Sequence, residues 1–273
     1  MLTEKEIKTF IETGRNFMKM PKEDPDYLTD QQLKKIQPPL VKAAQSNELI
    51  SLPSNFDNIP LDNDFMHIIN SRQSHRVYTQ KPLSKLELSY LLWCTQGVKE
   101  IRGKSYATLR TVPCGGARHE FETYFIVQYV EDLDPGLYHY LPMTHQIEFI
   151  KEIDDAKSFI STSVGGQSWA AKASVVFYYS AVFYRAEWRY GIYAHRVALM
   201  DIGHVMQNLY LAATAAKLGT CALGYIDPDY LNAQFNLDGV EECMICCCPV
   251  GTIDEKDKQA EADFYAFVKE QNL

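Results

Sequence analysis

The sequence has no run of about 18 apolar residues, the length that a membrane-spanning helix needs, so we expect no transmembrane segment. The first twenty residues are polar and amphipathic and lack the apolar stretch of a secretory signal. Basic residues are in deficit, with 27 Lys and Arg against 35 Asp and Glu, and the formal net charge is -8. Because nucleic-acid binding needs a basic face, this balance argues against that class of protein. We therefore expect neither a nucleic-acid partner nor a membrane partner.

Several ligand-binding motifs are also missing. No Gly-x-Gly-x-x-Gly pattern follows a predicted strand and no Walker loop occurs, so neither a Rossmann unit nor a P-loop is supported. Four cysteines cluster at Cys243, Cys246, Cys247 and Cys248, but neighbouring residues of a strand point to opposite faces, and no second pair stands at zinc-finger spacing. We predict no metal site. Seven cysteines, an odd number in a chain too long to need disulfides, indicate a reducing, cytoplasmic compartment.

The first sixty residues differ in character from the rest. Prolines interrupt them repeatedly, and the one clear helix, over residues 3–18, begins at Thr3. We interpret residues 1–60 as a helical N-terminal arm that packs on the body, and residues 61–273 as the body itself. In the body, apolar strands alternate with long helices. This pattern predicts an α+β fold with a central mixed or antiparallel sheet flanked by helices.

Particular elements of the body can be predicted from local patterns. Ser84 is the expected N-cap of a helix that runs to Gln96. The segment 173–182 is too apolar for a strand with a wet face, so we place it centrally in the sheet. The helix predicted over residues 195–218 is apolar nearly all round, which indicates burial in the core or against a second subunit. A short helix capped by Asp229 and a strand from Cys243 to Val250 follow.

The stretch that most clearly suggests a ligand contains Arg72, Ser74 and Arg76. In an extended segment, a spacing of two places these side chains on one side. Guanidinium groups present forked donors that match phosphate oxygens, and a hydroxyl can reach a further oxygen. One surface could therefore hold a phosphate monoester and the polyol attached to it, although a solvated loop is the alternative.

Two glycine-containing turns add to this picture. Gly115 and Gly116 follow Pro113, and Gly224 follows Leu223, which lets the backbone approach a flat ligand closely. An ordinary turn is the alternative reading of each, and Cys–His catalysis by Cys114 with the nearby His119 stays open. These features suit a phosphorylated planar cofactor that is held largely by backbone amides.

In this order and spacing, the stretches resemble the nitroreductase superfamily of FMN-dependent oxidoreductases, and they are most similar to its SagB-type dehydrogenases. The resemblance covers roughly residues 65–258. It is carried by Arg72-Gln73-Ser74-His75-Arg76, by Pro113-Cys114-Gly115-Gly116-Ala117-Arg118-His119, by Gly136-Leu137-Tyr138-His139-Tyr140, and by Gly203, Gln207-Asn208-Leu209, Leu218-Gly219 and Leu223-Gly224. It implies a homodimer with FMN at the subunit interface. Cys114 stands where serine is usual, which leaves the substrate in doubt.

The resemblance also implies roles for individual residues. It assigns the FMN phosphate and ribityl chain to Arg72, Gln73, Ser74 and Arg76. Further cofactor contacts are implied for Pro113, Cys114 and Gly115 on the flavin of the partner subunit, Gln167 on the pyrimidine edge, Leu223 and Gly224 at flavin N5, and Lys256 and Lys258 on the phosphate. Arg118, Arg189 and Tyr190 are candidates for the substrate side. No catalytic acid or base is named, because the flavin carries the redox chemistry.

Three functions follow as alternatives. The first is an oxidoreductase that uses NAD(P)H to reduce nitro, quinone or related acceptors. The second is a SagB-type dehydrogenase that oxidises azoline rings in a peptide. The third is a flavin-binding protein without catalytic activity, which the cysteine at position 114 keeps open.

Overall fold

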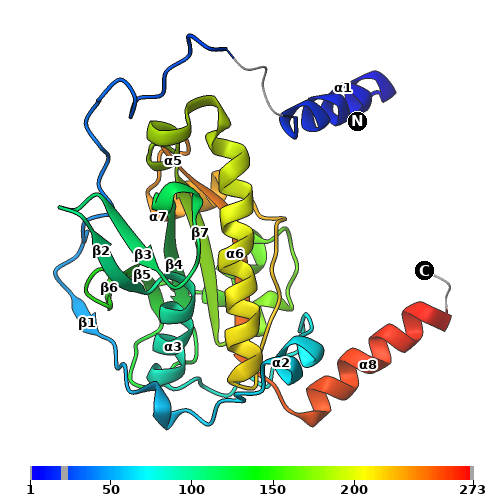
Figure 1. Cartoon of the computed structure of the whole chain (residues 1–273). Coiled ribbons are helices and arrows are strands. Elements are labelled where there is room, and N and C mark those ends of the chain that lie inside the picture. The colour runs from blue at the N-terminus through cyan, green and yellow to red at the C-terminus, as the bar shows by residue number, and fades with distance from the viewer. Residues whose placement is uncertain (1, 20–23, 271–273) are drawn as a thin grey trace.

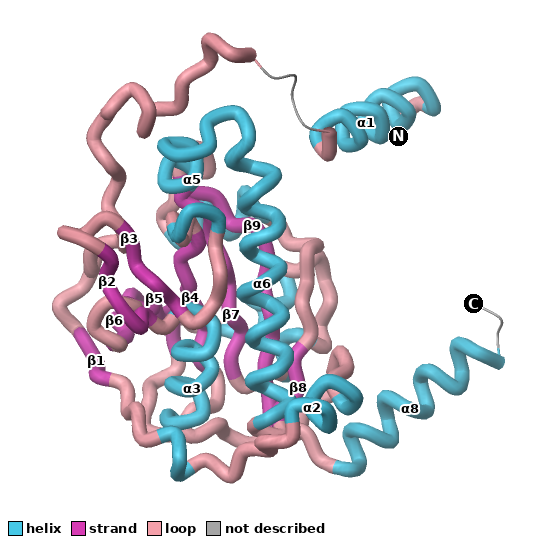
Figure 2. The backbone as a smooth tube through the Cα atoms, viewed as in Figure 1, coloured by secondary structure: helices cyan, strands magenta, loops and turns pink. Residues whose placement is uncertain are grey.

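The computed structural model describes residues 2–19 and 24–270, and its centre is a seven-stranded sheet (Figures 1 and 2). The hydrogen-bonded order is β1-β6-β5-β4-β7-β9-β8, and neighbouring strands are antiparallel. The strands are β1 (Leu49–Ser51), β4 (Phe121–Val127), β5 (Gly136–Leu141), β6 (Gln146–Lys151), β7 (Val175–Val182), β8 (Leu218–Thr220) and β9 (Glu242–Thr252). A separate hairpin joins β2 (Val98–Arg102) to β3 (Ala107–Arg110). The predicted α+β architecture is confirmed, with an antiparallel sheet.

Helices cover both faces of this sheet. The α-helices are α1 (Glu4–Phe17), α2 (Phe65–Ser71), α3 (Lys85–Gln96), α4 (Ala156–Ser163), α5 (Phe183–Tyr190), α6 (Ala194–Ala215), α7 (Pro228–Phe235) and α8 (Glu255–Glu270). Short 3-10 turns occur at η1 (Phe56–Asn58), η2 (Gly115–Ala117), η3 (Ala170–Lys172) and η4 (Gly191–Tyr193). Within the described ranges, no helix combines the length and the apolarity needed to cross a membrane.

Strand alternation divides the core into two layers. In β4, Phe125 and Val127 point toward α3 and α6, whereas Tyr124 and Ile126 point toward α4 and α7. Figure 1 shows α3 and α6 lying side by side over the first of these faces. The predicted central position of the segment 173–182 is confirmed, because β7 lies between β4 and β9.

Local signals set the helix ends, with one exception. The hydroxyl of Ser84 accepts the N–H of Glu87, whose carboxylate accepts the N–H of Ser84, so the predicted cap is present as a full capping box. The prediction of Asp229 as the cap of α7 was wrong. Asp227 accepts the N–H of Tyr230 at 2.9 Å, because Pro228 occupies the first helical position.

The long helix α6 is not buried all round. Its buried face includes Ile202, Val205 and Leu209, which pack on the sheet, but Leu199 and Met200 on the other side are 49% and 53% exposed. The apolar residues of α6 that face the sheet therefore build the core, whereas Leu199 and Met200 are left largely exposed.

The N-terminal segment reaches the body at several points. Helix α1 has no buried residue, and Figure 1 shows it apart from the sheet. The following segment lies against the body: the N–H of Gln31 donates to the carbonyl of Trp188 at 2.7 Å, and β1 pairs with β6 at the sheet edge. Residues 24–51 thus extend the body rather than form a separate core.

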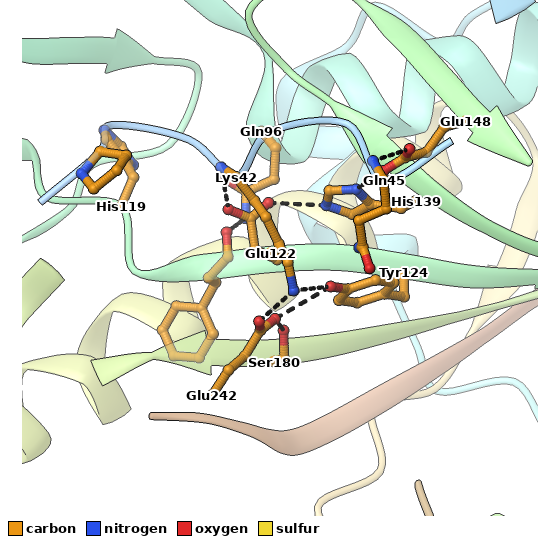
Figure 3. Close-up of polar contacts among 12 residues, drawn as sticks. Lys42, Gln45, Gln96, His119, Glu122, Tyr124, His139, Glu148, Ser180 and Glu242 are labelled. Carbon is orange, nitrogen blue, oxygen red and sulfur yellow. Dashed lines mark hydrogen bonds and ion pairs between the residues drawn. The ribbon is translucent and has the colours of Figure 1, made fainter. Parts of the chain in front are cut away.

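A row of charged side chains crosses the sheet beneath residues 42–46 of the N-terminal segment (Figure 3). His139 of β5 lies between Glu148 of β6 at 2.7 Å and Glu122 of β4 at 3.0 Å, and Arg185 reaches Glu122 at 2.6 Å. Burial alone would lower the pKa of His139, but its hydrogen bonds to the two carboxylates raise that pKa instead. The row is therefore a buried network of paired charges.

Residues 42–46 cover that network. The ammonium of Lys42 contacts Glu242 at 2.5 Å and the Tyr124 hydroxyl at 2.7 Å, as Figure 3 shows. The N–H groups of Gln45 and Ser46 donate to Glu148 at 2.6 and 2.7 Å. Because these contacts replace water around the buried carboxylates, the charged row holds the segment on the sheet.

Candidate functional site

One tyrosine of α6 joins two of the stretches that the sequence singles out. The Tyr210 hydroxyl lies 2.9 Å from the hydroxyl of Ser74 and accepts the N–H of Ala222 at 2.8 Å. The guanidinium of Arg72 lies over the Tyr210 ring, 5.3 Å from its centre. The segment 72–74 and the turn that contains Leu223 are therefore neighbours, and Arg72 and Ser74 share one side of their segment, as the spacing of two predicts.

Arg76 extends this surface toward the loop after α4. Its guanidinium lies 5.9 Å from the ring centre of Trp169, and its backbone N–H donates to the carboxylate of Glu261 on α8. Gln167 belongs to the same loop, where its amide donates to the carbonyl of Val164 at 3.2 Å. The segment 72–76, the loop after α4 and helix α8 therefore meet around Arg76.

The two residues of the 223–224 turn differ in what they can offer a ligand. The N–H of Leu223 donates to Cys247 at 2.8 Å and the carbonyl of Leu223 accepts from Cys247 at 3.0 Å, so the sheet already uses both groups. Gly224 is exposed, and no atom lies within 4 Å of the place where a Cβ would stand. Of the two predicted contacts, only Gly224 has open space.

Gln73 and His75 point away from this surface. They line a cavity of about 540 Å³ together with Lys258. Lys256 does not line that cavity, and its N–H donates to the Asp254 carboxylate at 2.9 Å. The structure therefore brings Gln73 and Lys258 together, but on the other side of the segment from Arg72 and Ser74.

The turn that follows Pro113 lies elsewhere on α6. Both carboxylate oxygens of Asp201 accept the N–H of Gly115, at 2.9 and 3.1 Å. Asp201 precedes Tyr210 by nine residues, which is about 13 Å along a helix. The two predicted halves of the cofactor site are therefore well separated within one chain.

Cys114 belongs to a buried acidic cluster. Its sulfur lies 3.3 Å from Glu120 and 3.2 Å from Asp201, and it accepts the N–H of His119 at 3.0 Å. Burial and the two carboxylates raise the pKa of the Cys114 thiol far above its usual value, and burial, with Arg110 nearby, lowers the pKa of His119 to about 2. Burial thus disfavours both charged groups of a Cys–His pair, and the sulfur contacts the backbone N–H of His119 rather than its ring, which argues against the Cys–His alternative.

The same cluster has the residue types of a metal site. One possible ligand atom from each of Cys114, Glu120 and Asp201 lies within 4.8 Å of the others. Asp201 accepts the N–H of Gly115 and also contacts the Cys114 sulfur, so internal hydrogen bonds already occupy these groups. The absence of a metal site stays a prediction.

Glu120 gives the cluster a dependence on pH. Burial and the neighbouring Asp201 raise the pKa of Glu120 from 4.5 to about 7. Between pH 4.5 and about 7, Glu120 holds a proton in the folded state that it has released in the unfolded chain. This proton raises the free energy of unfolding at low pH, and the contribution is lost as the pH rises through about 7. In the wild type the free energy of unfolding should fall between about pH 5 and 8, and we predict that Glu120→Gln makes this fall smaller by roughly 1–3 kcal/mol. Urea denaturation at each pH measures it.

An exposed glutamate provides the control for this measurement. Glu152→Gln removes a carboxylate at the surface and should leave the pH dependence unchanged. A wild-type stability that is flat over this range, or equal slopes for wild type and Glu120→Gln, would contradict the assignment.

The three candidates for the substrate side fall into two groups. Arg118 is 3% exposed, donates to the carbonyls of Gly116 and Tyr106 at 3.0 and 2.8 Å, and lies over the Tyr106 ring, so contacts within the chain occupy its guanidinium. Arg189 and Tyr190 line a second cavity of about 580 Å³. Only these two candidates have space beside them for a ligand.

Sequence reasoning missed several residues that organise the site. Tyr210, Asp201 and Glu120 belong to no recognisable motif. Asp201 and Tyr210 lie within a helix, and Glu120 directly precedes a strand. The available signal was the polarity of Asp201 inside a helix that is otherwise apolar, since a buried carboxylate requires a partner. Nothing local identifies that partner as the N–H of Gly115.

Comparison with known proteins identifies the family of the chain. The profile of the nitroreductase family matches residues 69–252. The chain is 32% identical over 184 residues to a nitroreductase-like protein of Methanocaldococcus jannaschii, which covers 67% of this chain and 88% of that protein.

Two curated relatives are processing proteins. The microcin B17-processing protein McbC of Escherichia coli is 29% identical over 134 residues, covering 47% of this chain and 49% of McbC. The trifolitoxin-processing protein TfxB of Rhizobium leguminosarum is 29% identical over 183 residues, covering 63% and 48%. The chain thus spans about half the length of each.

Solved structures share the fold. A nitroreductase-like protein of Ralstonia eutropha superposes with a TM-score of 0.62 at 22% identity, covering 86% of this chain and 98% of that one. A chain of the E. coli microcin synthetase McbBCD complex, with truncated pro-MccB17 bound, superposes with a TM-score of 0.57 at 19% identity, covering 93% and 95%.

Proposed function

Because the chain belongs to the nitroreductase family, near its SagB-type members, we propose that it is an FMN-dependent oxidoreductase. The observation that carries this proposal is the convergence on Tyr210. This side chain brings Arg72 and Ser74 next to the turn that ends in Gly224. A phosphate-binding surface beside an open glycine turn suits a ligand that has a phosphorylated chain at one end and a flat ring at the other.

The residues present fit FMN. Arg72 and Ser74 offer charge-assisted and hydroxyl hydrogen bonds for the phosphate and the ribityl chain. Gly224 leaves room for a ring to lie against the backbone. When bound, FMN supplies the hydride chemistry, and the protein contributes binding, orientation and exclusion of water.

A homodimer would complete the site. Within one chain the turn at Gly115 and the surface at Arg72 are separated along α6, and membership of the family supports a site that the turn of a second copy completes. Apolar side chains on α2 and α6 are exposed beside these stretches, among them Phe65 at 63% and Met200 at 53%. A single such side chain is unremarkable, but exposed apolar side chains on two helices that touch each other support an interface.

We assign NAD(P)H as the electron donor and a nitro, quinone or related compound as the acceptor. The similarity to the Methanocaldococcus protein over most of its length supports this assignment. The names of McbC and TfxB support the second candidate, a SagB-type dehydrogenase that oxidises azoline rings in a peptide. A flavin-binding protein without catalytic activity is the third candidate. The cysteines are free thiols, which supports a reducing compartment such as the cytoplasm.

Anaerobic stopped-flow reduction of the FMN-loaded protein separates the candidates. We expect NADPH or NADH to bleach the flavin absorbance within seconds, and menadione to restore it. Reduction by an azoline-containing peptide, but by neither pyridine nucleotide, would favour the SagB-type function. A flavin that none of these compounds reduces would leave the non-catalytic candidate.

A further inference from the structure

The second cavity has walls from two distant parts of the chain. It measures about 580 Å³, and its lining includes Asp24, Tyr27 and Gln32 from the N-terminal arm, and Arg189, Tyr190 and Tyr193 from the connection between α5 and α6. Among the described residues, three tyrosine rings, the guanidinium of Arg189 and the carboxylate of Asp24 give it an aromatic lining with one group of each charge.

The arm side of the cavity is held in place by specific contacts. The N–H of Ile192 donates to the Tyr27 hydroxyl at 3.1 Å, and the N–H of Gln31 donates to Trp188 at 2.7 Å. Gly191 has a φ of +50°, and a Cβ built on it would stand 1.8 Å from the Tyr27 hydroxyl oxygen. The close approach of Tyr27 to the backbone therefore requires glycine at position 191.

The body side of the cavity adjoins the glycine turn after Cys114. A Cβ on Gly116 would stand 2.2 Å from Nε of Arg189, and one on Gly115 would stand 3.2 Å from the Tyr190 ring. Arg189 and Tyr190 thus pack directly on this turn. In the proposed dimer, the turn is where the partner's flavin would lie, so the cavity opens beside the cofactor.

We infer that this cavity binds the substrate, that the substrate is an aromatic ring bearing an anionic group, and that the arm helps to select it. The inference rests on the proposed function, whose substrate class it narrows. It assigns the arm a direct part in recognition, since more than half of the lining residues come from residues 24–32.

Arg189 is oriented for such a ligand. One terminal nitrogen of its guanidinium donates to Gln31 and to the Tyr106 hydroxyl, both at 3.0 Å, which fixes the plane of the group. Its Nε is buried and has no acceptor among the described residues. Because Nε faces the Gly116 turn, a carboxylate on the ligand would instead accept from the second terminal nitrogen of the guanidinium, and the rings of Tyr27, Tyr190 and Tyr193 offer faces on which an aromatic ring can pack.

The test uses two probes that differ in charge. The dissociation constants of 4-nitrobenzoate and nitrobenzene are measured by titration calorimetry on the FMN-loaded protein. We expect Arg189→Gln to weaken 4-nitrobenzoate about tenfold or more and to change nitrobenzene less than about twofold. Asp24→Asn should act in the opposite direction and tighten 4-nitrobenzoate by about two- to fivefold, because it removes a like charge from the lining.

Further variants test the part played by the arm. Tyr27→Ala should weaken both probes about tenfold, since the wall is lost, while flavin content stays at the wild-type level. Arg189→Lys keeps the charge without the fork and should fall between wild type and Arg189→Gln. Arg15→Gln, on the exposed helix α1, is the matched control and should change neither probe.

Two outcomes would overturn the inference. The first is an equal loss of affinity for the two probes in Arg189→Gln. The second is an unchanged affinity for both probes in Tyr27→Ala. Failure of the proposed function would look different. A protein that takes up no FMN would contradict that proposal, yet the two probes would still report on this cavity, because all of its walls belong to one chain.

Discussion

Replacing Arg185 with Met should lower the free energy of unfolding by about 3–5 kcal/mol, the usual cost of removing one partner from a buried ion pair. Arg185 is 4% exposed, and its guanidinium lies 2.6 Å from the carboxylate of Glu122. It also donates to the carbonyls of Pro39 and His119, at 3.1 and 3.2 Å. Without it, the buried carboxylate of Glu122 loses the guanidinium and keeps hydrogen bonds to His139 and to the backbone N–H of Lys42. Urea denaturation followed by circular dichroism measures the loss.

The control for this prediction is Arg102→Met, which removes an exposed guanidinium on β2 and should cost less than about 0.5 kcal/mol. The loss in Arg185→Met should shrink when Glu122→Gln is added, because the unpaired charge then disappears. A loss below about 1 kcal/mol in the single variant would show that water or a rearranged side chain compensates Glu122.

The second large effect concerns the cofactor. Arg72→Ala should raise the dissociation constant of FMN about 10- to 100-fold, since one charge-assisted phosphate hydrogen bond contributes about 1.5–3 kcal/mol. Arg76→Ala should act in the same direction. Tyr210→Phe should weaken FMN less, because it removes only the hydroxyl that links Ser74 to Ala222. Fluorescence titration of apoprotein with FMN measures each constant.

The alternative place for the phosphate can be tested in the same titration. Lys258 lines the 540 Å³ cavity on the opposite side of the segment, together with Gln73. Unchanged FMN affinity in both arginine variants, with a large loss in Lys258→Ala, would move the phosphate to that cavity. Arg102→Ala again serves as the surface control.

Features that depend on near neighbours could be read from the sequence. The Ser84 cap, the buried strand β7 and the common side of Arg72 and Ser74 all follow from backbone periodicity over a few residues. The resemblance that the sequence indicates agrees with the match of the nitroreductase family to residues 69–252. These conclusions needed no knowledge of what lies opposite each residue.

Other features were decided only by the tertiary structure. Ser74 and Tyr210 are 136 residues apart, and Gln31 and Arg189 are 158 apart, so neither contact exists until helices and arm have packed on the sheet. The pairing of Leu223 with Cys247 likewise uses an N–H that the sequence alone had left available for a ligand. Local patterns determine the conformation and the side of the chain on which a residue lies. The groups that meet a side chain depend on long-range packing, in which a buried polar atom is stable only beside a partner from elsewhere in the chain.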